Sequence, residues 1–92
     1  MQNNQLSSVI YTAIGSYWDS SLNINDVICT TFDEQTAIRR SVMQINQDYE
    51  NIITEDDMLN IKSYVDFNRF IARKLPKGNA FVIHRSTLIV RE

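Results

Sequence analysis

The spacing of apolar residues predicts that most of the chain is helical. Apolar side chains recur every three or four positions along residues 6–18, which places them on one face of a helix. This stripe consists of Leu6, Val9, Ile10, Ala13, Ile14, Tyr17 and Trp18. Asp19-Ser20-Ser21 follows, and such side chains end helices because they compete for backbone hydrogen bonds. The pattern therefore predicts a first helix over residues 6–18.

Three polar motifs mark the starts of further helices, after a connecting loop over residues 22–31. Each has the form of a capping box, in which a hydroxyl and an acid three residues later satisfy free N–H groups at a helix start. They are Thr31-x-x-Glu34, Thr54-x-x-Asp57 and Ser63-x-x-Asp66. Pro76 is expected to end the last helix, because proline cannot continue one. The side chains expected to face inward are Ile38, Val42, Ile45 and Tyr49 with Met43 beside them, then Met58, Leu59, Tyr64, Phe67, Phe70, Ile71 and Leu75.

The last stretch, residues 80–92, differs in kind because it is dense in β-branched residues. Two apolar runs flank Arg85-Ser86-Thr87, which predicts one extended strand or a small hairpin. We therefore expect a helical domain over residues 1–78 and a β-type extension over residues 79–92. The extension is too apolar for a free terminus, so it either folds back on the helices or pairs with another chain. Pairing with a second copy would give a symmetric dimer.

Composition and charge narrow the class of protein. The chain has 92 residues, 43% of them hydrophobic and 22% charged, as in one ordinary globular domain. Its single cysteine, Cys29, cannot form an intramolecular disulfide and fits a reducing compartment. No apolar run reaches the length of a membrane span and the first residues lack a signal pattern, so we expect a bacterial-type cytoplasm. The net charge is −2, and Arg39-Arg40 and the basic residues of 69–77 are interpreted as solvated helix faces rather than a nucleic-acid site.

Residues 42–71 carry a series of short motifs in a fixed order. They are Val42-Met43, Asp48-Tyr49-Glu50, Ile53-Thr54-Glu55-Asp56-Asp57, Ile61-Lys62-Ser63 and Phe70-Ile71. Without a gap, this run resembles the second half of an acyl carrier protein. The resemblance implies a mainly α fold, a four-helix bundle of the acyl carrier type, to which this chain adds its C-terminal extended strand or small hairpin.

The resemblance also implies a serine that carries phosphopantetheine, and this chain lacks it. Where the family has Asp-Ser-Leu, the chain reads Glu34-Gln35-Thr36, and the amide of Gln35 cannot form the phosphodiester that a serine hydroxyl forms. Arg39 and Arg40 occupy a face that the family makes acidic so that basic enzymes can dock on it. The chain therefore departs from the family both at the site of attachment and at the docking face, and we expect no cofactor.

No other group of residues in the sequence points to catalysis or to a metal. His84 is the only histidine, and no nucleophile is paired with it in the sequence. Cys29 has no second cysteine at a metal-ligand spacing. The carboxylate pairs Asp33-Glu34 and Asp56-Asp57 lie at expected helix starts, where negative charge complements the helix dipole. We expect neither enzymatic activity nor a bound metal.

Three functions are left to compare. The first is a non-catalytic, acyl-carrier-like domain that has lost its phosphopantetheine site and binds a protein partner, as a regulatory module of the inhibitor or immunity type. The second is a divergent carrier in lipid or secondary-metabolite biosynthesis, modified at an atypical hydroxyl. The third is a small enzyme, which lacks a nucleophile–base pair. The residues expected to contact a protein partner or a second copy are Arg39 and Arg40 in the second helix, with Phe81, Ile83, Leu88 and Val90 in the extension.

Overall fold

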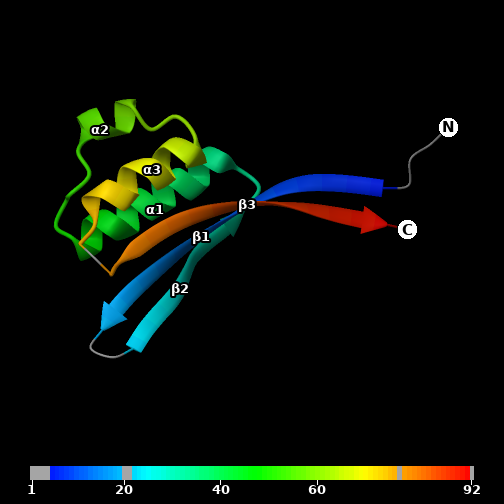
Figure 1. Ribbon diagram of the computed structural model, residues 1–92. Helices are drawn as coiled ribbons and strands as arrows, with labels where there is room; N and C mark the ends of the chain where they lie inside the picture. The colour runs from blue at the N-terminus through cyan, green and yellow to red at the C-terminus, as the bar shows by residue number, and fades with distance from the viewer. Residues whose placement is uncertain (1–4, 20–21, 77, 92) are drawn as a thin grey trace.

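The protein is a two-layer α/β domain, with helices on one face of an antiparallel sheet (Figure 1). The structure, a computed structural model, describes residues 5–19, 22–76 and 78–91. Its elements are β1 (Gln5–Asp19), β2 (Leu22–Thr31), α1 (Glu34–Asp48), α2 (Glu55–Leu59), α3 (Tyr64–Lys74) and β3 (Ala80–Arg91). The strand order is β2-β1-β3, so β1 is the central strand and the two chain ends run side by side.

The expected four-helix bundle is therefore wrong, because residues 6–18 form a strand. β1 pairs with β2 from Tyr11 to Asp19 and with β3 from Gln5 to Ser16. The apolar residues of this segment fit a helical period, but many are β-branched or aromatic and suit a pleated strand. Because β1 pairs with a strand on each side, the segment adopts the alternating period of a strand rather than the period of a helix. The loop expected over residues 22–31 is also wrong, since all of it is β2. Ser20-Ser21 lies outside the described residues.

The three later helices are confirmed, with their starts at or near the expected caps. At α2, the Thr54 side chain accepts from the N–H of Asp57 while the Asp57 carboxylate accepts from the N–H of Thr54. At α3, Ser63 accepts from the N–H of Asp66. At α1 the cap is Asp33 rather than Thr31, whose hydroxyl instead accepts from the N–H of Asp33. Local sequence therefore specifies the helix starts.

The core lies between the helices and one face of the sheet. Ile38, Val42 and Ile45 are buried, which confirms the inward stripe of α1. Met43 and Leu59 are 67% and 71% exposed, so their expected burial is wrong. The extension forms the single strand β3 and packs against its own chain. The buried apolar residues are Ala13, Ala37, Ile38, Val42, Ile45, Ile53, Ile61, Phe67, Ile71, Phe81 and Ile83.

Asn68 fastens the helical layer to the edge of the sheet. Its Nδ2 donates to the carbonyl of Ile83 at 3.0 Å, and its Oδ1 accepts from the N–H of Ile83 at 2.8 Å. Asn46 makes the same two-point contact with the backbone of Ile53. Each amide thus replaces a missing backbone neighbour, because a buried N–H or C=O without a partner is costly.

Part of the sheet extends beyond the helices. Residues Gln5–Ile10 of β1 pair with Ser86–Arg91 of β3, and we call this two-stranded segment the arm. Figure 1 shows the arm as the blue and red ribbons that project away from the helical layer. The Tyr11 and Tyr64 rings meet edge to face, with centroids 5.8 Å apart, where α3 begins to cover the sheet. The arm therefore lacks the helical cover of the rest of the sheet.

Candidate functional site

The most distinctive surface is the sheet face turned away from the helices, which we call the open face. Side chains of paired residues lie on the same face, and they alternate along each strand. Ala13 and Ile83 are paired and buried under the helices, so the intervening residues must point the other way. The open face consists of Ser8, Ile10, Thr12, Ile14 and Ser16 from β1, Asn25, Val27 and Thr30 from β2, and Ala80, Val82, His84, Ser86 and Leu88 from β3.

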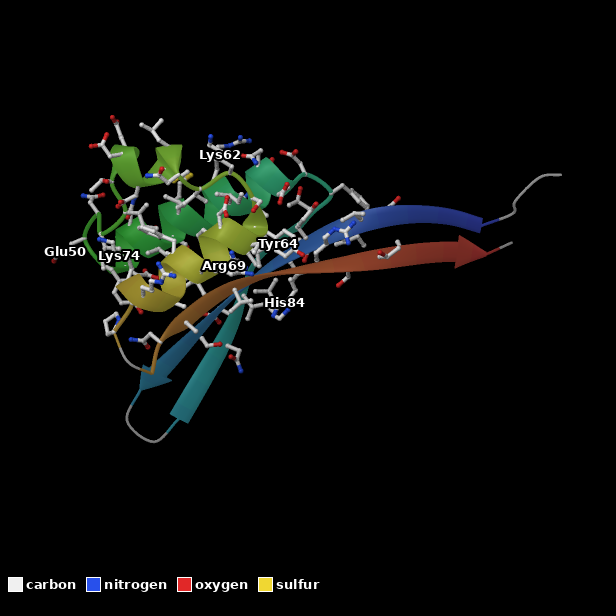
Figure 2. All side chains as sticks on the ribbon, turned by 45° about the horizontal axis from the view of Figure 1, so that its top comes forward. Glu50, Lys62, Tyr64, Arg69, Lys74 and His84 are labelled. Carbon is white, nitrogen blue, oxygen red and sulfur yellow. The ribbon has the colours of Figure 1, made fainter. Side chains whose placement is uncertain are left out.

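The open face has no acidic residue, lysine or arginine, and it mixes apolar with small polar side chains that water reaches. Val27 is 65% exposed and Leu88 47%, while Ile10, Ile14 and Val82 are partly exposed. The charges gather instead on the helical layer, where Figure 2 labels Lys62, Arg69 and Lys74, with His84 on the opposite side. A solvated antiparallel sheet face is ordinarily polar, and one that exposes Val and Leu side chains without charged neighbours is typical of a contact surface.

The expected contact residues do not form one surface. Arg39 and Arg40 are exposed on α1, and Arg39 donates to the Thr36 hydroxyl at 3.3 Å. Phe81 and Ile83 are 2% and 1% exposed, so a partner does not reach them. Leu88 is exposed, but on the open face rather than on the helical side. Val90 pairs with Leu6 in the arm, and its side chain lies outside the described part. The helical and strand residues thus belong to different sides of the domain.

Three residues of the open face escaped sequence interpretation. Ile10 and Ile14 lie in the stripe expected to form one face of a helix, and Val27 lies in the segment expected to be a connecting loop. The available signal was the density of β-branched and aromatic residues from Val9 to Ile14, which favours a strand over a helix. The pairing partner of that strand lies 70 or so residues away, as in Val9 opposite Thr87, and no local pattern reveals it.

The position of the missing serine has a structural role. The Gln35 amide donates to the carbonyl of Lys62 at 3.2 Å, and the Glu34 carboxylate accepts from the N–H of Tyr64 at 2.8 Å. These contacts tie the start of α1 to the start of α3. Ser41, a candidate hydroxyl for an acyl carrier, is fully buried and donates to the carbonyl of Ala37. The geometry therefore gives no support to a phosphopantetheine site in α1.

Two carboxylates at helix starts have a lowered pKa: Asp33 is the N-cap of α1, and Asp57 is the third residue of α2, within its capping box. The hydroxyl of Thr36, and then its N–H, donate to Asp33 and lower the pKa of that carboxyl below 3.8. The N–H of Thr54 donates to Asp57 and lowers its pKa in the same way. Hydrogen bonds to the charged form explain both shifts. These two acids stabilise helix starts. A lowered pKa makes neither of them suited to proton transfer near neutral pH.

The two caps predict a dependence of stability on acid. Because the folded pKa lies below the unfolded value of about 3.9, each carboxylate stabilises the fold above that pH. The contribution is lost as the pH falls through the folded pKa. Asparagine can serve as the N-cap at position 33 about as well as aspartate, and at position 57 its Oδ1 can still accept from the N–H of Thr54. In both places it carries no charge. We expect the double variant Asp33→Asn/Asp57→Asn to lose less stability than the wild type between pH 6 and pH 3.

Urea denaturation of both proteins at the two pH values measures this difference. Asp56→Asn serves as the matched control, because Asp56 lies in the first turn of α2 but the capping box is formed by Thr54 and Asp57. An equal acid loss in the wild type and the double variant would contradict the assignment of these caps as the acid-sensitive groups.

The remaining reactive side chains do not assemble into a chemical site. Cys29 is a free thiol, partly buried and paired in the sheet with Ala13. His84 is exposed on the open face. Among the described side chains, no group of three or more His, Cys, Asp or Glu could hold a metal ion. In the same part of the chain, no helix is both long enough and apolar enough to cross a bilayer.

Comparisons with known proteins leave the chain without a matching relative. No family model, no curated protein and no solved structure matches it. The resemblance of residues 42–71 to an acyl carrier protein therefore stays a prediction. The order α1, α2, α3 is compatible with it over that range, whereas β1 and β2 stand where the carrier fold has its first helix and connecting loop. The fold and the open face are the basis for a functional proposal.

Proposed function

We propose that this domain is a non-catalytic protein-binding module whose partner packs on the open face. The observation that carries the proposal is the uncharged sheet face left without a covering layer among the described residues. Burying Val27 and Leu88 against a partner removes apolar area from water at about 25 cal/mol per Å². The neighbouring Thr12, Thr30 and Ser86 supply hydroxyls without the desolvation cost of a charged group. This composition matches the centre of a protein interface, which is depleted in charged residues.

The chemistry of the open face favours a protein over a nucleic acid. Affinity for nucleic acid depends on Lys and Arg placed against phosphates, and the open face has neither. The unpaired thiol of Cys29 fits a reducing cytoplasm. A module of this kind acts by occupying a surface of its partner, which is how a regulatory protein of the inhibitor or immunity type works. Arg39 and Arg40, on the helical side, would then form a separate, peripheral contact.

The test places charges at two exposed apolar positions of the open face, one on β2 and one on β3, and a matched charge elsewhere. Val27→Asp/Leu88→Asp puts two carboxylates where the partner must exclude water, and burying an unpaired charge is costly. We expect this variant to retain its partner at least about tenfold less well than the wild type. Immobilised protein and an extract of the cells that make it, with quantitative mass spectrometry of the retained proteins, give the measurement.

Leu59→Asp is the control, because Leu59 is 71% exposed on α2 and lies on the helical side. It should retain the same partner as the wild type. Circular dichroism checks that all the variants are folded. Loss of the partner in Leu59→Asp, with retention in Val27→Asp/Leu88→Asp, would move the binding surface to the helices and reject the proposal.

A further inference from the structure

The central strand has a vacant edge along the arm. β2 pairs with β1 only from Tyr11 onward, because the chain leaves the sheet at Thr31 to enter α1. Gln5–Ile10 therefore has β3 on one side and, among the described residues, no strand on the other. Unpaired N–H and C=O groups along a strand edge recruit another strand. An isolated two-stranded ribbon is also only marginally stable in water, so pairing with a further strand would stabilise the arm.

The contact of Asn68 with Ile83 shows which backbone groups face the vacancy. Both polar groups of Ile83 point to Asn68, hence away from β1. In an antiparallel ladder, two kinds of residue pair alternate. In one the backbone N–H and C=O groups bond to the facing residue, and in the next they point away from it. Ala13, opposite Ile83, therefore points its N–H and C=O away from β3, and so do the alternate residues before it. The backbone groups that face the vacancy are those of Gln5, Ser7 and Val9.

The other two edges of the sheet are protected, and this one is not. The outer edge of β3 is occupied at Ile83 by Asn68, and the strand contains Arg85 and Arg91. β2 contains Asp26 and has an irregular register beside Ala13 and Ile14. Charges, bulges and covering side chains are the usual means of blocking edge pairing. Gln5–Ile10 has no charged residue, no proline and no break in register with β3.

We infer that the vacant edge of β1 pairs with the same edge of a second copy of this chain. Antiparallel pairing about a two-fold axis at Ser7 sets Ser7 opposite Ser7 of the second copy and Gln5 opposite its Val9. This register satisfies all the outward N–H and C=O groups of both copies. A shift centred on Ser8 would set Gln5 opposite Tyr11, which β2 already occupies. The two arms join into a four-stranded sheet, with the absence of charge on Gln5–Ile10 avoiding repulsion between identical strands.

Proline scanning of the two arm edges tests this pairing. Ser7→Pro removes an N–H that faces the vacancy and makes no bond to β3, and proline is tolerated at such edge positions. Thr87→Pro is the matched control, because Thr87 pairs with Val9 and its N–H points to the outer edge of β3. Sedimentation equilibrium of the full chain should give twice the 10.7 kDa monomer mass for the wild type and for Thr87→Pro. Ser7→Pro should remain a folded monomer.

A cross-linking pair covers the case in which a proline variant does not fold. Residues opposite each other in a hydrogen-bonded antiparallel pair have Cα atoms about 5.5 Å apart, within disulfide range. Ser7→Cys should therefore form a covalent dimer with oxidised glutathione. Thr87→Cys should not, because the two β3 strands would lie about 14 Å apart across the joined sheet. Cys29 is present in both variants, so any cross-link through Cys29 would appear in both and serves as the internal reference.

Three results would overturn the inference. They are a wild-type monomer at chain concentrations up to about 1 mM, a dimer lost in Thr87→Pro but kept in Ser7→Pro, and a dimer in which Ser7→Cys does not cross-link. The pairing uses the edge of β1 and the proposed partner uses the open face. The variant Val27→Asp/Leu88→Asp leaves the vacant edge intact. It therefore tests the proposed partner on the open face separately from the pairing of two copies.

Discussion

Replacing Phe81 with alanine is expected to lower the free energy of unfolding by about 3–5 kcal/mol. Phe81 is 2% exposed and lies opposite Gly15, whose missing side chain leaves space for a ring on the covered face of the sheet. Truncation removes the transfer free energy of the ring and leaves a cavity under the helices. A domain of this size has a total stability of about 5–15 kcal/mol, so the loss is a large fraction of the whole, and the variant should unfold at a clearly lower urea concentration than the wild type. Urea denaturation followed by circular dichroism measures the loss.

Leu88→Ala is the matched control for Phe81→Ala, because it truncates an apolar side chain in the same strand. Leu88 is 47% exposed, so its loss should cost less than about 1 kcal/mol. A loss below about 1 kcal/mol for Phe81→Ala as well would place Phe81 at the surface, as the sequence suggested. The pair therefore separates a core role for β3 from a role in contacting a partner.

Asn68→Ala is expected to destabilise the protein by about 2 kcal/mol and to loosen the edge of β3. The amide satisfies both polar groups of Ile83, which is 1% exposed. Without the Asn68 amide, the N–H and the C=O of Ile83 lose their hydrogen-bond partner, because both groups point away from β1. Amide hydrogen exchange at Ile83 should accelerate by about tenfold or more relative to the wild type, a readout that a general loss of stability would not confine to one edge. Urea denaturation gives the free energy.

Two further substitutions sharpen the test of Asn68. Asn68→Asp keeps an oxygen for the N–H of Ile83 but loses the donor to its carbonyl, so its stability should lie at or below that of Asn68→Ala. Asn68→Leu keeps a side chain of similar size, yet it satisfies neither group. Full stability of Asn68→Leu would contradict the role of the amide.

The starts of the helices could be predicted because their causes are local. Thr54 and Asp57 lie three residues apart and complete each other's hydrogen bonds within one helical turn. Ser63 caps α3 through an N–H only three residues away. Such contacts depend on nearby sequence and very little on distant segments. The burial of Ile38 and Ile45 followed for a similar reason, since their spacing places them on one face of α1.

The candidate site was only partly accessible from sequence. The extension was predicted to be one extended strand or a small hairpin, and it forms a single strand. Leu88 is exposed, as a contact residue should be. Phe81 and Ile83 were expected at the same surface, but alternation along β3 turns them toward the helices. Whether the odd- or the even-numbered residues of a strand face the core depends on the layer that covers the strand. The contacts proposed for Arg39 and Arg40 stay a prediction.

The sequence by itself determined three helix starts, the inward face of α1 and the extended form of residues 80–91, because hydrogen bonds and periodicity act within a few residues. Only the tertiary structure decided that residues 6–18 form a strand. That segment satisfies both a helical and a strand pattern, and the choice depends on β3, which pairs with it from the far end of the chain. The same long-range pairing buried Phe81, left the open face uncovered and exposed the edge at Ser7, since backbone groups and side chains take their direction from the partner strand.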